Sequence, residues 1–160
     1  MDPRIESAVT WFQRIYCDGV PVLLRQNETS FLSFVCVVAA TDALAGYRYS
    51  IDDVGARFRD FVSTYFPPAY GPHAANLYRF RCRLLHNFSP AHFTLVHATP
   101  AAHLMPSRIG DVQLCDAVFF TDMRHAAESY FAELRADASL QASMLQRLGN
   151  LSRGGEIWAG

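Results

Sequence analysis

Hydrophobic side chains recur at intervals of three and four residues along most of the chain, the spacing that places them on one face of an α-helix. Segments that interrupt this pattern, such as CDGVP at 17–21 and FPPAYGP at 66–72, contain glycine and proline, which end helices. The pattern therefore predicts about five helices, over residues 3–17, 27–45, 50–65, 73–87 and 122–148.

Capping residues support three of these helix starts. Asp2 stands directly before a proline, which is typical of an N-cap followed by the first helical position. Asn27 or Thr29 can cap the second helix. Ser50 with Asp53 three residues later resembles a capping box at the start of the third.

The pattern changes after the fourth helix. HFTLVHA (92–98) and DVQLCDAVFFT (111–121) are rich in β-branched and aromatic residues and are separated by the polar TPAAHLMPSRIG. We expect a mainly α fold, a bundle of about five helices with a small β-hairpin-like insertion at about 92–121 before the last helix. Residues 1–148 form a single domain in this interpretation, and the glycine-rich 149–160 forms a flexible C-terminal tail.

Composition narrows the classes of function. The chain has 160 residues, of which 51% are hydrophobic and 13% aromatic, so it can form a folded core and is not a disordered protein. The formal net charge of −1 argues against a general polyanion binder, and we expect no DNA binding. The chain contains 14 arginines and no lysine. Two explanations of that bias are open: recognition of phosphate or carboxylate groups, and genomic base composition.

The sequence predicts neither a metal site nor a cofactor. The four cysteines are scattered and include no C-x-x-C pair, so we expect reduced thiols. His92 and His97 are five residues apart on a predicted strand and would face opposite sides. The N-terminus has no signal-peptide pattern, and the most apolar run, 31–46, is shorter than a membrane span and contains Asp42. We expect a cytoplasmic protein without a membrane segment.

The segment LYRFRCRLLHNFSP (77–90) carries the candidate chemistry. Helical spacing accounts for more of its residues than strand alternation does. It places Arg81 within an apolar face and puts Arg79, Arg83 and His86 on a second, polar face. An arginine cannot lose its charge, so Arg81 needs a partner. Two partners are open: the lone acid Asp42, or a phosphate in a polar cleft between subunits.

His86 follows Arg81 by five residues, which separates the two side chains by about 140° on an ideal helix. Asn87, Ser89 and Pro90 indicate that the helix ends at this point, and a terminal histidine can swing toward the arginine. A histidine that only complements the helix dipole is the alternative interpretation.

The stretch RCRLLHNF (81–88) resembles the R-x4-H signature of HEPN domains, with Arg81 and His86 as its two polar residues. HEPN domains are helical bundles that commonly dimerise so that two motifs face each other. For many members the resemblance implies a metal-independent endoribonuclease in which the RNA 2′-hydroxyl attacks the adjacent phosphorus.

The resemblance assigns catalysis to Arg81, which would hold phosphoryl oxygens, and to His86, which would move a proton. We assign RNA contacts to Arg79, Arg83 and Asn87. The expected partners are a second copy of the chain, RNA and a protein partner, and a defence or stress effector is the expected class.

Two residues depart from the family pattern. Cys82 stands where active members usually carry a polar residue, and Phe88 stands where toxin-type members carry a tyrosine. These departures favour the alternative function, a catalytically inactive HEPN-like module that dimerises and binds a protein or a nucleotide.

Overall fold

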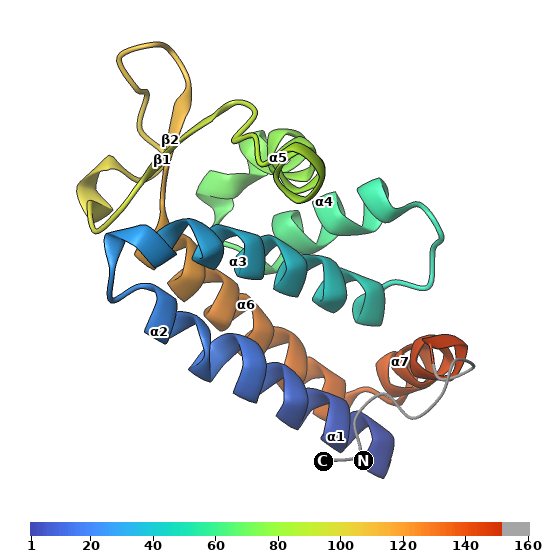
Figure 1. Cartoon of the computed structure of the whole chain (residues 1–160). Helices are drawn as coiled ribbons and strands as arrows, with labels where there is room; N and C mark the ends of the chain where they lie inside the picture. Colours follow the sequence, from blue (N-terminus) through green and yellow to red (C-terminus); the bar gives the residue numbers. More distant parts are fainter. Residues whose placement is uncertain (152–160) are drawn as a thin grey trace.

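The computed structural model describes residues 1–151 and is mainly α-helical, which confirms the predicted fold class (Figure 1). The helices are α1 (Pro3–Phe12), α2 (Val20–Leu23), α3 (Asn27–Arg48), α4 (Val54–Tyr65), α5 (Ala74–Asn87), α6 (Asp116–Ala136) and α7 (Ala138–Leu151), and the strands are β1 (Phe93–Val96) and β2 (Val112–Cys115). The tail predicted from residue 149 begins inside α7, and its remainder lies outside the described residues.

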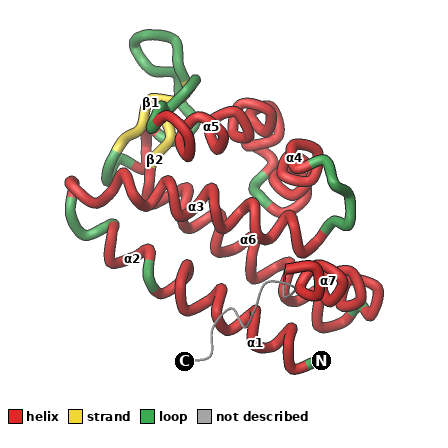
Figure 2. Tube along the Cα trace, turned by 45° about the vertical axis from the view of Figure 1, so that its right-hand side comes forward, coloured by secondary structure: helices red, strands yellow, loops and turns green. Residues whose placement is uncertain are grey.

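Helix α3 is the centre of the bundle and packs against α4, α5, α6 and α7 (Figures 1 and 2). It is long and apolar enough to cross a membrane by length and composition, but 56% of its most apolar window is buried inside the protein. A helix that is apolar on nearly all sides is typical of a protein core.

Local capping differs from the expectation at two of the three helix starts. Asp2 caps α1 as predicted, and its Oδ1 accepts the amide hydrogen of Arg4 at 2.8 Å. Asp53 itself is the N-cap of α4, accepting from the Ala56 amide at 2.9 Å. Thr29 does not cap α3, because its hydroxyl donates to the Leu23 carbonyl at 2.7 Å and so joins α2 to α3.

Helix α5 covers the predicted range but turns a different face to the core. Its buried side chains include Leu77, Phe80 and Leu84, whereas Leu85 is 38% exposed. The core face is therefore centred near Phe80 and Leu84. Arg81 consequently lies at the edge of the apolar face rather than at its centre.

The insertion is not a hairpin. Strands β1 and β2 pair in parallel, with Phe93 opposite Val112 and Val96 opposite Cys115, so the chain must cross over between them. The predicted second strand is too long, because 116–121 already forms the first turns of α6. Phe119 and Phe120 are buried there because they begin the three-and-four spacing that continues along α6. The insertion is followed by two helices, α6 and α7, instead of the one that was predicted.

A buried hydrogen-bond network attaches this insertion to the bundle. His103 Nδ1 accepts the Cys115 amide hydrogen at 3.1 Å, so its Nε2 carries the proton that it shares with the Tyr70 hydroxyl at 2.7 Å. Tyr70 in turn donates to the Asp122 carboxylate at 2.7 Å. Burial lowers the pKa of His103 below its ordinary value, although the Asp122 charge opposes this effect. The network therefore holds a neutral imidazole.

Replacing His103 with leucine should remove both of its hydrogen bonds and lower the free energy of unfolding by about 1–3 kcal/mol. Because the folded-state pKa is lowered, the unfolded chain binds a proton first as the pH falls through 6.5. The wild type should lose stability as the pH falls from roughly 7.5 to 5.5, and His103→Leu should lose less. Urea unfolding at both pH values measures this, with exposed His125→Gln as control. Equal losses in wild type and His103→Leu would contradict the assignment.

Candidate functional site

Helix α5 determines how the two motif residues lie. It remains helical through Asn87, and Phe88 ends it in the left-handed conformation (φ 51°) with its amide donating to the Leu84 carbonyl at 3.2 Å. His86 is therefore inside the last turn, not on a frayed end, and its side chain is exposed. Helix geometry directs Arg81 and His86 about 140° apart, so one chain does not bring them to the same face.

Arg81 is paired with Asp42 of α3. Its Nη2 lies 2.8 Å from Asp42 Oδ2, and the two side chains are 20% and 21% exposed. Burial acts to lower the pKa of Arg81, but the hydrogen bond and charge of Asp42 outweigh this effect and raise it. The sequence left Asp42 and a phosphate as possible partners for Arg81. Within a single chain the partner is Asp42.

The pair is joined by one hydrogen bond rather than by the two of a guanidinium–carboxylate fork. Arg81 Nε and Asp42 Oδ1 are both buried and have no hydrogen-bond partner. The other polar contact of this guanidinium is Cys82 Sγ, at 4.0 Å from Nη1. The arrangement neutralises both charges but leaves polar atoms on each unsatisfied.

An apolar surface adjoins this ion pair, and we call it the α3–α5 face. Its side chains are hydrophobic, half-buried or exposed, and come from two helices: Phe31, Leu32, Val35 and Ala39 of α3, and Leu85 and Phe88 at the end of α5. Phe88 is 72% exposed and its ring centroid lies 6.5 Å from that of Phe31.

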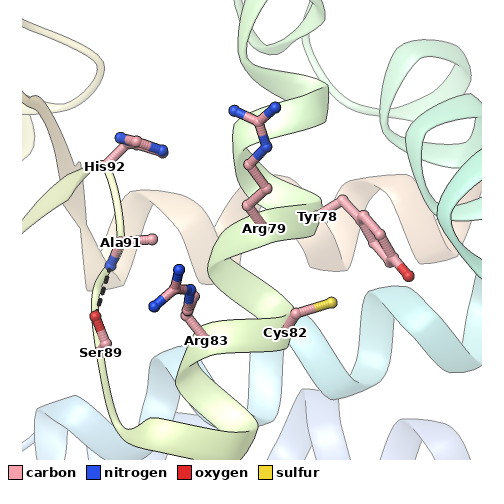
Figure 3. A pocket seen from close by; sticks show the side chains of 7 residues that line it. All are labelled: Tyr78, Arg79, Cys82, Arg83, Ser89, Ala91 and His92. Carbon is pink, nitrogen blue, oxygen red and sulfur yellow. Dashed lines mark hydrogen bonds between the residues drawn. The ribbon is translucent and has the colours of Figure 1, made fainter.

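The polar side of α5 contributes to a pocket of about 480 Å³ between this helix and the segment that follows it (Figure 3). Arg79 and Arg83, both predicted to bind RNA, line the pocket together with His92. Asn87, the third predicted RNA contact, is exposed at the helix end and is not among the lining residues. His92 was not predicted, because nothing in its spacing relates it to the two arginines.

A second polar cluster escaped sequence analysis. Asp116 is 1% exposed at the start of α6 and accepts hydrogen bonds from the Ala98 amide at 3.2 Å and the Ala117 amide at 2.7 Å. His97 Nδ1 lies 2.5 Å from the same carboxylate. Through these contacts Asp116 attaches the end of β1 to α6. Within residues 1–151, no group of three His, Cys, Asp or Glu side chains is placed to hold a metal ion.

Comparison of the chain with protein-family models, with curated proteins and with solved structures finds no match in any of the three. The functional argument therefore depends on the side chains themselves and on their geometry.

Removing one member of the ion pair should destabilise the bundle. Asp42→Asn leaves the Arg81 charge half-buried and should cost about 1–3 kcal/mol of unfolding free energy, less than for a fully buried pair because both side chains are one-fifth exposed. The double variant Asp42→Leu with Arg81→Met should cost less than Asp42→Asn alone. Urea unfolding of the variants measures both effects. A double variant that loses as much stability as Asp42→Asn, or more, would contradict this account of the pair.

Proposed function

We propose that the chain is a HEPN-like module that associates with a second copy of itself through the α3–α5 face and has no nuclease activity of its own. The observation that supports this proposal most directly is the Arg81–Asp42 hydrogen bond at the edge of that face. It gives the motif arginine a structural partner, so the guanidinium is not free to receive a phosphate.

The residues of the α3–α5 face fit a second copy of the same chain. A two-fold interface brings the same surface of both molecules together and must be self-complementary. This face carries one cation, Arg81, and one anion, Asp42, at its edge. Two copies related by a two-fold axis therefore bring equal numbers of positive and negative charges to the interface. Val35 and Ala39 leave the outward side of α3 without long polar side chains, which permits close helix packing.

Phe88 adds an independent observation. A non-glycine residue in the left-handed conformation costs about 1 kcal/mol, and glycine or asparagine usually occupies this position after a helix. Phe88 is instead aromatic and 72% exposed. A strained, exposed aromatic residue beside other exposed hydrophobic residues is accounted for if it contacts a second molecule.

Phe88→Asn is the sharpest test of self-association. Asparagine favours the left-handed backbone, so the variant should fold and melt like the wild type while its dimer dissociation constant rises at least tenfold. Sedimentation velocity over a concentration series measures the constant. Ile109→Asn, at a position 80% exposed on the insertion, removes a comparable apolar side chain elsewhere and should leave it unchanged. A wild type that stays monomeric at all concentrations would rule out the proposal.

A metal-independent endoribonuclease formed by the dimer is the second candidate. The observation in its favour is the incomplete pairing of Arg81, whose guanidinium is one-fifth exposed and keeps Nε without a hydrogen-bond partner. A phosphate that displaced Asp42 would gain the whole guanidinium fork. His86 would accept the proton of the attacking 2′-hydroxyl, the P–O5′ bond would break, and a second His86 would protonate the leaving oxygen.

Incubation of RNA with the protein in EDTA separates the two candidates. The binding module predicts that wild type, Arg81→Ala and His86→Ala all leave RNA intact, as does the control His125→Ala. Cleavage by wild type and by His125→Ala, with 2′,3′-cyclic phosphate ends, together with its loss in both motif variants would replace the first proposal by the second. Cleavage that is equal in all four proteins would come from a contaminant or from another site.

A further inference from the structure

The pocket beside α5 concentrates positive charge. Arg79 and Arg83 stand one helical turn apart, both are exposed, and neither forms a salt bridge within residues 1–151. The pocket lining includes no aspartate or glutamate. Like charges four residues apart destabilise a helix, so this pair favours binding of an anion.

Figure 3 shows how the groups are directed. The Arg83 guanidinium lies between α5 and the Ser89–Ala91 segment, and the His92 ring points toward the Arg79 side of the helix. Tyr78 and Cys82 point to the other side of α5, where the Tyr78 ring centroid lies 5.8 Å from that of Phe58 in α4. Two guanidinium groups and an imidazole thus border the same open space.

The segment that carries His92 is fixed by backbone contacts. Ala91 has a left-handed backbone (φ 53°), and its amide donates to Ser89 Oγ at 3.3 Å. The His92 carbonyl accepts the Val112 amide hydrogen at 3.3 Å, which fastens the segment to the start of the parallel sheet. Ser89 keeps its own hydroxyl hydrogen available as a donor. These hydrogen bonds hold the backbone of the segment in place before any ligand binds.

We propose that this pocket binds the phosphomonoester group of a nucleotide. The oxygens of the anion accept hydrogen bonds from the guanidinium groups of Arg79 and Arg83, whose planar forks match phosphate geometry. His92 and Ser89 complete the polar contacts. A volume of about 480 Å³ exceeds that of a phosphate ion and lies within the range of small-molecule sites, so it has room for an attached nucleoside. The site uses a different side of α5 from Arg81 and does not depend on dimerisation.

Isothermal titration of the full chain with adenosine monophosphate, inorganic phosphate and adenosine tests the pocket. We expect adenosine monophosphate to bind, inorganic phosphate to bind more weakly at the same site, and adenosine not to bind. Arg79→Gln and Arg83→Gln should each weaken binding of adenosine monophosphate at least tenfold, and His92→Ala should weaken it severalfold.

Arg108→Gln is the matched control, because it removes one exposed arginine from the insertion, away from the lining residues. It should leave the affinity within about twofold of wild type. Thermal melting confirms that each variant folds. Binding of phosphate but not of adenosine monophosphate would show that the site binds the free anion and would overturn the proposal that it binds a nucleotide. Equal weakening by all arginine variants, binding of adenosine alone, or no binding of either anion at up to roughly 10 mM would overturn the site itself.

Discussion

The hydrogen bond between Arg81 and Asp42 determines what the rest of α5 can do. Arg81 and Asp42 are charged side chains that lie mostly buried where α5 packs against α3. Either charge would be destabilising at that position without the other. Their pairing fixes α5 against α3, the central helix of the bundle. It also removes the motif arginine from the groups available for a ligand, which is why we give self-association precedence over catalysis.

Three arginines within five residues of α5 consequently have two different environments. Arg81 is neutralised at the edge of the α3–α5 face, whereas Arg79 and Arg83 remain unpaired and line an open pocket with His92. The helix separates an apolar surface, which we propose binds a second chain, from a cationic surface, which we propose binds a phosphate. His86, exposed in the last turn, faces neither Arg81 nor the pocket lining in a single chain.

The sequence predicted those features that depend on near neighbours along the chain. Helical spacing located α5, although the face that it turns to the core differs from the predicted one. Two anomalies, a lone acid and a lone arginine in apolar helices, made Asp42 one of the two candidate partners for Arg81. Features that join distant segments were missed. The parallel pairing of β1 with β2 and the bonds of His103 to Tyr70 and Cys115 connect residues whose separation carries no pattern. The start of α6 was misassigned because Val, Phe and Thr favour strands, but burial against the core overrides that preference.

A crystal structure of the protein grown with phosphate would test the central claim most directly, because it shows where an anion binds and which partner Arg81 keeps. We predict that Arg81 stays on Asp42, close to the 2.8 Å seen in the free chain, and that the phosphate lies between Arg79, Arg83 and His92. A phosphate bound to Arg81, with the Asp42 carboxylate displaced and the other two arginines unoccupied, would contradict the account and restore the motif as a catalytic site.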